Sequence, residues 1–470
     1  MSTFQETFAQ CKRDPEWAAQ TIIELNEDVE KLKSQINKDS QNSSKPPSSD
    51  GFKKPKPKSL RSKTGKAQGG QQGHNGNTLH QVEEPDEIET HHVDHCHQCG
   101  YSLENVPCRF EKRQLFDIPP MEIHVTEHRG EIKSCPFCQS QNRASFPEGV
   151  KAPVQYGPQL KSLAVYLHDY QLLPYERTRE MLGDLFNQPI SRATIVEAEC
   201  QLHQKLEPIE ETIVQQLLSS PAVHFDESGL RVNAKRHWLH VASTNTLTHY
   251  TVHQKRGKEG MDAGGILPNF NGIAVHDAWK SYFSYPCDHA LCHAHHLREL
   301  TGIYEQWEQQ WAKEMIDLLL EMKATVEAEG ILDITTILSL DQRYDRIIEM
   351  GLEEDEQLNP PESLPKAKRG RKKQSPAKNL LDRLQSYRSE ALGFIRNPFI
   401  PFDNNQAERD VRMIKVQQKV SGTFRDSKGA ERFSRIRGYI STMKKQSHSV
   451  MEALHSVMTG DPISPDEKSK

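Results

Sequence analysis

Three stretches of sequence decide the fold, and each carries one acidic residue. They are PAVHFDESGLRV (221–232) with Asp226, NGIAVHDAWKSY (271–282) with Asp277, and DNNQAERDVRMIKVQQKVSG (403–422) with Glu408. The apolar runs before the first two acids predict buried strands that each deliver an acid at the strand end. The third stretch has the apolar spacing of a helix and is rich in Arg and Lys.

Carboxylates that converge from separate segments can hold two magnesium ions about 3.5–4 Å apart, and such a pair drives in-line attack on a phosphodiester. We therefore expect Asp226 and Asp277 to share one ion and Glu408 to complete the second site. Glu227 should point to the opposite face of its strand, because side chains alternate along a strand. The sequence thus favours Asp226 over Glu227, with magnesium (two ions, or manganese) as the catalytic cofactor.

The order of elements predicts the fold class. Residues 222–255 contain three strand-like runs that suit an antiparallel meander, and a short helix and a fourth strand follow up to Asp277. Residues 289–395 read as helical, with a break at 359–373, before the helix that carries Glu408. This order predicts an α+β multidomain protein with a ribonuclease-H-like catalytic core and a helical insertion. The insertion explains the long separation of Glu408 from Asp277 without a long structureless loop.

Composition shifts divide the chain into eight expected parts. They are a helix and coiled coil at 1–40, a basic disordered linker at 41–85, a zinc-binding module at 86–150, a helical, helix-turn-helix-like DNA-binding region at 151–218, the first part of the core at 219–300, the helical insertion at 301–395, the last part of the core with the catalytic helix at 396–450, and a C-terminal tail at 451–470.

The N-terminal helix carries a short heptad pattern. Its expected a and d positions are Ile22, Leu25, Val29, Leu32 and Ile36. Three heptads predict a coiled coil of modest strength. The alternative is an amphipathic helix that packs on its own domain.

Two CxxC pairs predict a structural zinc site with four thiolate ligands. The ligands are Cys96, Cys99, Cys135 and Cys138. Alternating residues between the pairs suit two strands that would return the chain to the metal. A redox dithiol is the alternative, although it would need only one pair.

The distribution of charge and the number of cysteines further narrow the class of protein and its expected compartment. The net charge of −5 hides basic runs at 45–66 and 366–373, which could track phosphates. No apolar run is long enough to span a membrane, and no secretory signal is visible. Nine cysteines without such a signal indicate a reducing compartment, so we expect a cytoplasmic, DNA-associated protein.

The catalytic helix also predicts a DNA contact. Glu408, Arg412, Lys415 and Lys419 follow spacings of four, three and four, which place them on one helical face. An acid that leads a row of cations fits a metal ligand beside a phosphate track, although a solvated stripe has the same spacing. The aromatic residues that interleave with cations after residue 421 are expected in the core.

Two further features leave alternatives open. Residues 175–206 form two helices around a break, the second capped by Ser191, which outlines either a DNA-binding helix-turn-helix or a plain helical pair. Residues 287–296 crowd two cysteines with four histidines. A second zinc site there is less favoured than a helix that brings His293 and His296 near the active site or DNA, with His295 and Arg298 beside the DNA.

Several of these blocks together resemble a DDE transposase of the insertion-sequence-66 family. The blocks are NSSKPPSSDG (42–51), the paired CxxC motifs, HFDESGLRV (224–232), WLHVAST (238–244), HDAWKSY (276–282), CHAHHLREL (292–300) and DNNQAERDVRMIKVQQKVSGTFR (403–425). The resemblance implies catalytic acids at Asp226, Asp277 and Glu408, an N-terminal region that handles transposon ends, and DNA contact by Lys415. Ser228 and Asp426 depart from the family pattern, and Asp426 puts a phosphate contact by Arg425 in doubt.

The expected function is metal-dependent DNA strand cleavage and strand transfer at the ends of an insertion sequence. The partners would be the element ends and target DNA, with a homodimer or larger assembly on DNA, possible accessory proteins of the same element, and no membrane. The alternatives are a non-catalytic zinc-containing DNA-binding regulator, which has no need for three convergent carboxylates, and a nuclease that hydrolyses without joining.

Overall fold

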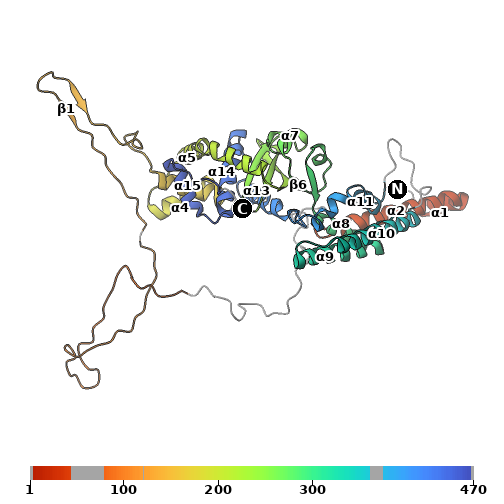
Figure 1. The fold of residues 1–470 in the computed structure, drawn as a ribbon, viewed down its shortest axis with the longest axis horizontal. Coiled ribbons are helices and arrows are strands. Elements are labelled where there is room, and N and C mark those ends of the chain that lie inside the picture. Colours follow the sequence, from red (N-terminus) through yellow and green to blue (C-terminus); the bar gives the residue numbers. More distant parts are fainter. Residues whose placement is uncertain (1–3, 44–78, 120, 360–373, 467–470) are drawn as a thin grey trace.

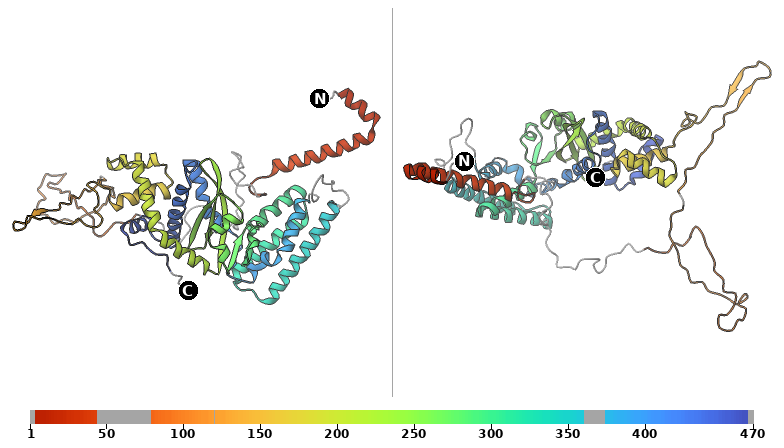
Figure 2. Two further views of the ribbon diagram at one scale, coloured as in Figure 1. Left: turned by 90° about the horizontal axis from the view of Figure 1, so that it is seen from above. Right: turned by 180° about the vertical axis from the view of Figure 1, so that it is seen from behind.

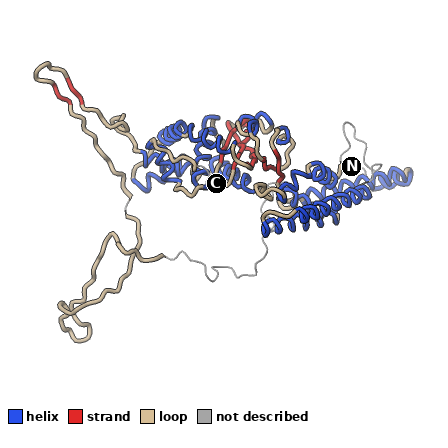
Figure 3. Tube along the Cα trace, in the orientation of Figure 1, coloured by secondary structure: helices blue, strands red, loops and turns tan. Residues whose placement is uncertain are grey.

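The computed structural model describes residues 4–43, 79–119, 121–359 and 374–466, and Figure 1 shows their arrangement. Most of the predicted linker and the basic run at 366–373 lie outside the described residues. Helices dominate, most of the strands gather near the middle of the molecule, and the others lie on an arm at one end (Figure 3). The described chain is thus an α+β protein with one main sheet.

The main sheet has five strands in the order β5-β4-β3-β6-β7. Neighbours β3, β4 and β5 are antiparallel, whereas β6 and β7 run parallel to β3. The three antiparallel strands confirm the predicted meander, and the short helix α7 (Lys258–Ala263) follows it as expected. The strands are β3 (Ala222–Val232), β4 (Lys235–Ser243), β5 (Thr248–His253), β6 (Ile273–His276) and β7 (Asp288–Leu291).

The sequence reading missed β7, because the four-residue run DHAL has no alternation of its own. Its extended state comes from pairing with β6, in which Ile273 lies opposite Asp288 and His276 opposite Leu291. The expected position of Asp226 at a strand end is also wrong. Asp226 is the fifth residue of the eleven-residue β3, because the hairpin with β4 carries that strand on to Val232.

Each face of the sheet has its own apolar core. On one face, Leu230, Leu239 and Val241 pack against the helix α13 (Asn405–Ser421). On the other face, Val223 and Phe225 join a larger core, to which four helices each contribute at least two buried residues. These helices are α5 (Arg192–Lys205), α6 (Glu207–Leu218), α14 (Ser427–Lys445) and α15 (Val450–Thr459).

The helix α15 corrects the expectation of a tail at 451–470. Ala453, Leu454 and Val457 are buried in the large core, and their spacing is that of an apolar helical stripe. The N-cap is Ser449, whose side chain accepts a hydrogen bond from the Glu452 backbone N–H. The C-terminal segment is therefore part of the folded core.

The predicted helical insertion is present and forms a separate apolar core around Trp311 and Tyr344. The first helix of the insertion runs from His293 to Trp307 and so crosses the boundary expected at residue 300. Its buried residues have helical spacing on both sides of that boundary. The helices are α8 (His293–Trp307), α9 (Gln310–Glu329), α10 (Ile334–Leu358), α11 (Pro376–Ser386) and α12 (Arg388–Leu392).

The candidate helix-turn-helix consists of α4 (Tyr175–Phe186) and α5, and Ser191 caps α5 as predicted. Ile195, Ala198 and Leu202 of α5 are fully buried. The helix packs against α3 (Pro158–Val165), α14 and α15. Because this face of α5 packs against other helices, the structure favours a plain helical pair over a DNA-binding helix-turn-helix that uses this face.

Residues 79–150 form two extended arms at one end of the molecule (Figure 1). The two strands expected between the cysteine pairs are not found among the described residues, where Leu115 and Val125 are 90% and 83% exposed. Side chains without an apolar surface to cover them gain little from strand pairing. The arms instead contain one short hairpin, β1 (Ile132–Ser134) with β2 (Gln141–Arg143).

At the opposite end lie α1 (Phe4–Arg13) and α2 (Pro15–Asn37), which stand beside the helical insertion (Figure 2). The predicted heptad residues of α2 are exposed, with Ile22 and Leu25 both at 59%. Asn42, just after α2, hydrogen-bonds Glu305 of α8 at 3.3 Å. Within the described part of the chain, the apolar stripe of α2 therefore does not pack into a core.

Candidate active site

The candidate site lies where β3 and β6 separate. Their parallel pairing ends with His224 opposite Val275. Asp226 lies two residues farther along β3, and Asp277 follows the last residue of β6. Parallel strands that diverge leave an open edge at their carboxyl ends, which is where ligands bind in such sheets.

Asp226 and Glu227 belong to opposite faces of β3. His224 and Leu230, which share the face of Asp226, contact the segment and helix that carry Glu408. Glu227 instead accepts hydrogen bonds from Tyr282 at 2.6 Å and from Arg256 Nε at 2.7 Å. Glu227 is thus neutralised and fixed by its own partners, whereas Asp226 faces α13.

The electrostatics of Asp226 connect the three predicted acids. Burial raises the pKa of Asp226 well above its ordinary value, and the negative charges of Glu227, Asp277 and Glu408 raise it further. A hydrogen bond of 2.8 Å from the Glu227 backbone N–H acts in the opposite direction. Carboxylates from β3, β6 and α13 therefore share one weakly screened environment.

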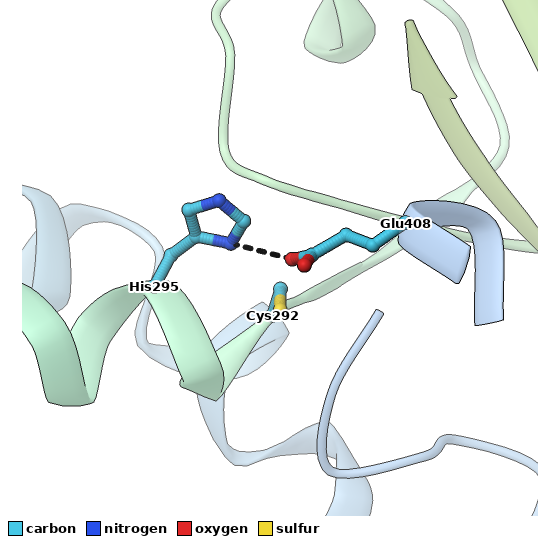
Figure 4. Close-up of side chains that lie close together, drawn as sticks. All are labelled: Cys292, His295 and Glu408. Carbon is cyan, nitrogen blue, oxygen red and sulfur yellow. Dashed lines mark ion pairs between the residues drawn. The ribbon is translucent and has the colours of Figure 1, made fainter. Parts of the chain in front are cut away.

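Glu408 lies in the first turn of α13, where the helix dipole stabilises a negative charge. Cations and a histidine surround it. Its Oε1 atom is 3.7 Å from both His295 Nδ1 and Arg298 Nη2, and its Oε2 atom is 3.5 Å from Arg412 Nη2. Figure 4 shows the carboxylate directed toward His295, with Cys292 beside it.

Asn404, the buried residue that precedes α13, ties the site together. Its side-chain Nδ2 donates to the Phe225 carbonyl at 2.7 Å, next to Asp226, and its Oδ1 lies 2.8 Å from His224 Nδ1. Its backbone N–H reaches Cys292 Sγ at 3.1 Å. The backbone N–H of Cys292 in turn donates to the carbonyl of His276, the neighbour of Asp277. One residue thus connects all three acid-bearing segments.

The residues present fit a divalent cation. Glu408 Oε1 and His295 Nδ1 are buried, and no hydrogen-bond donor or acceptor among the described residues satisfies them. Hard oxygen ligands are what magnesium prefers. Burial and neighbouring negative charges raise the pKa of Asp226, and a cation between the acids would remove that repulsion. Among the described residues, Asp226, Asp277 and Glu408 do not form a group with ligand atoms within 4.8 Å of one another, so a shared cation would have to draw their side chains closer together.

Cys292 was not predicted as a site residue, and His295 was expected beside the DNA. A ligand atom from each lies within 4.8 Å of one from Glu408. Burial raises the pKa of Cys292 to about 12, and its sulfur already accepts the Asn404 N–H. A protonated, hydrogen-bonded thiol is a poor metal ligand, so Cys292 positions Asn404. The crowded cysteines and histidines at 287–296 were the only sequence signal for this role.

The rest of the cluster at 287–296 has other partners. His289 contacts His276 at 3.0 Å, and His293 reaches the Ala391 carbonyl at 2.7 Å. Cys287 belongs to the large core. Among the described residues these side chains do not form a second cysteine and histidine metal group.

The predicted cation row of α13 is exposed, as its spacing suggested. Arg412 is 66% exposed although it pairs with Glu408. Lys415 donates to the Gly229 carbonyl at 2.5 Å, and Lys419 lies one turn farther along. Arg425 is exposed beyond the helix end. Asp426 beside it caps α14 by accepting the Gly429 N–H at 2.6 Å, which gives this departure from the family pattern a structural role.

The cations of α14 have internal partners instead. Arg435 pairs with Glu210 at 2.6 Å. Arg437 donates to the carbonyls of Asp169 and Tyr170 at 3.1 and 2.9 Å. Phe433 and Tyr439 are buried, as expected for core aromatics. Arg435 and Arg437 thus stabilise contacts inside the protein and do not form part of an exposed basic surface.

The two CxxC pairs occupy two separate tight turns. In each turn a backbone N–H donates to the first cysteine's carbonyl, from Gly100 to Cys96 and from Gln139 to Cys135 at 2.9 and 2.8 Å. Hydrogen bonds lower the pKa of Cys96, chiefly one from the Gln98 backbone. The four sulfurs do not form one group among the described residues. The structure therefore contains two separate thiol pairs.

Comparison with known families identifies the family of the chain. The model of the Transposase IS66 family matches residues 153–432, which is more than half of the chain.

The chain belongs to the IS66 transposase family.

The matched region of this IS66-family protein includes the sheet, the insertion, α13 and all three predicted acids. A second model, of a family of unknown function (DUF6444), matches residues 5–80, which contain α1 and α2. No curated protein matches the chain. Membership of a transposase family implies a DNA-binding, DNA-modifying enzyme. Among the described residues, no helix combines the length and apolar character needed to cross a membrane.

Proposed function

We propose that this protein catalyses metal-dependent DNA strand cleavage and strand transfer at the ends of an insertion sequence. One observation carries the proposal. The carboxylates of Asp226, Asp277 and Glu408 come from three separate segments, and the negative charges of Asp277 and Glu408 act on Asp226. Outside a cation site, such an arrangement costs stability and has no structural benefit.

The fold of the core supports the same proposal. Three antiparallel strands joined to two parallel strands, with α13 across one face, suit a ribonuclease-H-like catalytic core of DDE type. The helical insertion separates Asp277 from Glu408 along the chain, and Asn404 links the segments that carry them. These links support the proposal that the three acids act at one site.

In this proposal Asp226, Asp277 and Glu408 hold two magnesium or manganese ions. When bound, the ions activate the attacking oxygen and stabilise the charge on the phosphate and leaving oxygen. Asn404 keeps the three segments in register, and His295 with Arg298 keeps the Glu408 carboxylate directed into the site. Water attacks in the cleavage step, and the freed 3′ hydroxyl attacks target DNA in the joining step.

The exposed row Arg412, Lys415 and Lys419, extended by Arg425, is the proposed DNA track. It begins at Glu408, so a strand that follows the row would present a phosphate to the acids. Cations that neutralise phosphates give affinity with little dependence on sequence. Recognition of the terminal sequence would then come from other parts of the chain.

The arms and the N-terminal helices have proposed roles outside the core. Zinc held by Cys96, Cys99, Cys135 and Cys138 would require the two arm turns to come together. The exposed stripe of α2 suits a coiled coil between copies, which would help two element ends to be held in one homodimer or larger assembly. Accessory proteins of the same element are a further possible partner class.

The test uses purified full-length protein, a DNA duplex that carries an element end, and magnesium. Asp226→Asn, Asp277→Asn and Glu408→Gln should each lower cleavage at least about 1000-fold, while end binding in a gel-shift assay stays within about twofold. The exposed residues Asp288 and Glu431 provide matched controls through Asp288→Asn and Glu431→Gln, which should cleave normally.

Cleavage that survives in any of the three variants would remove that residue from the site. A wild-type protein that binds ends but never cleaves would favour the non-catalytic regulator. Cleavage without strand transfer to target DNA would identify a nuclease.

A further inference from the structure

A second group of possible metal ligands lies away from the three acids, inside the helical layer. It consists of His168, Asp169 and Glu199, each with one ligand atom within 4.8 Å of those of the other two. His168 and Asp169 belong to the π-helical turn η2 (Tyr166–Tyr170), and Glu199 belongs to α5. Single π-helical turns inside α-helices occur frequently at functional sites.

Two of the carboxylate oxygens have no partner. Asp169 and Glu199 are 2% and 3% exposed, and no donor among the described residues reaches Asp169 Oδ2 or Glu199 Oε1. A buried carboxylate oxygen without a hydrogen bond is costly. The other Glu199 oxygen, Oε2, accepts the Tyr175 hydroxyl at 2.9 Å, so this side chain is held with Oε1 directed elsewhere.

His168 is oriented as a metal-binding histidine. Its Nδ1 atom lies 2.7 Å from the Leu173 carbonyl, to which it donates, so Nε2 carries the lone pair. Burial lowers the pKa of His168 to about 4, so the ring is neutral at pH 7. The Nε2 atom lies 3.5 Å from Glu199 Oε1. Two acceptors therefore face each other with no donor between them.

The nearby guanidinium groups do not satisfy these acceptors. Arg437 donates to the backbone carbonyls of Asp169 and Tyr170. Arg432 Nε is 3.7 Å from Glu199 Oε2, which is beyond hydrogen-bond distance, and has no partner among the described residues. Neither Arg432 nor Arg437 therefore donates a hydrogen bond to the three facing atoms.

We propose that His168, Asp169 and Glu199 bind a divalent transition-metal ion, such as zinc, that joins η2 to α5. One imidazole nitrogen and two carboxylate oxygens are a ligand set that first-row divalent metals accept. Two ligand atoms each about 2.1 Å from a tetrahedral ion lie about 3.4 Å apart, close to the separation of His168 Nε2 and Glu199 Oε1. The ion would stabilise the helical layer and does not depend on the proposed catalytic acids.

The experiment measures zinc in the full-length chain. Protein is stripped with a chelator, reloaded with zinc, freed of excess metal and analysed by mass spectrometry for zinc per chain. The variant Asp169→Asn/Glu199→Gln should hold one zinc fewer than the wild type. Glu197→Gln is the matched control, because Glu197 is exposed on the same helix α5 and should leave zinc content unchanged. Thiol-bound zinc contributes equally to all three proteins.

Thermal unfolding of the same samples checks that the result is not a folding failure. Stripped double variant should unfold at no lower temperature than stripped wild type, because the substitutions remove facing negative charges. Zinc should then raise the unfolding temperature of the wild type and of Glu197→Gln more than that of the double variant. Equal zinc content and equal zinc-induced shifts would overturn the proposal and leave a shared proton as the group between the two acids.

Discussion

At the scale of single residues, partners rather than residue type separate the acids of the core. Asp226 and Glu227 are adjacent and both buried, yet Glu227 is paired with Arg256 and Tyr282 while Asp226 faces other acids. The sequence predicted this difference from strand alternation alone. The sequence did not predict the linking role of Asn404. Asparagine is common just before a helix as an N-cap, so its position there does not distinguish a buried residue from an ordinary cap.

We predict that Asn404→Ala lowers both stability and cleavage. Loss of its buried hydrogen bonds should reduce the free energy of unfolding by about 1–3 kcal/mol. Because the acid-bearing segments then lose their register, the folded variant should also need more magnesium for half-maximal cleavage. Urea unfolding and a magnesium titration of cleavage measure the two effects.

The neighbouring change Asn405→Ala is the control, since no side-chain hydrogen bond joins Asn405 to β3. It should leave the magnesium requirement unchanged. An Asn404→Ala protein with lower stability but an unchanged magnesium requirement would restrict Asn404 to a structural role.

At the scale of elements, α13 and α14 show how similar compositions take different roles. The helix α13 buries Ala407, Val411 and Ile414 and leaves its cations exposed. In α14, Arg435 and Arg437 turn inward to acids and carbonyls of the helical layer. Periodicity predicts which face of a helix is apolar, but not which neighbours its charged residues will meet.

We predict that Lys419→Ala weakens DNA binding without affecting the fold. Removing one phosphate contact should reduce the slope of log affinity against log salt concentration by about 1, equally for element-end and unrelated DNA. Fluorescence anisotropy at several salt concentrations measures the slope. Lys313→Ala on α9, an exposed lysine of the insertion, should leave it unchanged. Equal slopes for both variants and the wild type would place the DNA track elsewhere.

At the scale of the whole molecule, the two faces of the sheet and the insertion bury several histidines. Burial lowers the pKa of His240 and of His293 to about 4. Their pKa in the unfolded chain is about 6.5, so the unfolded state takes up protons first as the pH falls. Stability from these neutral rings is complete above pH 6.5 and is lost as the pH falls toward 4.

We therefore predict that the contribution of these neutral histidines to the free energy of unfolding declines between pH 7 and pH 5. His240 alone should account for about 2 kcal/mol of that decline, because each unit of pKa difference corresponds to about 1.4 kcal/mol. His240→Gln should remove its share, and His91→Gln, a change at an exposed histidine of an arm, should not. Urea unfolding of the wild type and both variants at pH 7 and pH 5 measures these declines. Identical declines in the wild type and His240→Gln would contradict the prediction.

The sequence by itself determined the local helices and strands and indicated which acids are catalytic candidates. Alternation predicted the meander β3–β5, apolar spacing predicted the insertion and α13, and the catalytic candidates followed from their settings. These properties depend on residues close together in the chain, so they can be read from it. The same patterns also led to two wrong predictions. They predicted a C-terminal tail where the structure has the buried helix α15, and two strands where the described residues of the arms have extended chain without strand pairing.

Only the tertiary structure decided the rest. The strand β7 exists because β6 is available to pair with it, and Asn404 matters because β3 lies within hydrogen-bond distance. The group His168, Asp169 and Glu199 likewise appears only when η2 packs on α5. Each of these depends on contacts between distant segments, whose free energy comes from burial and pairing that no local window of sequence contains.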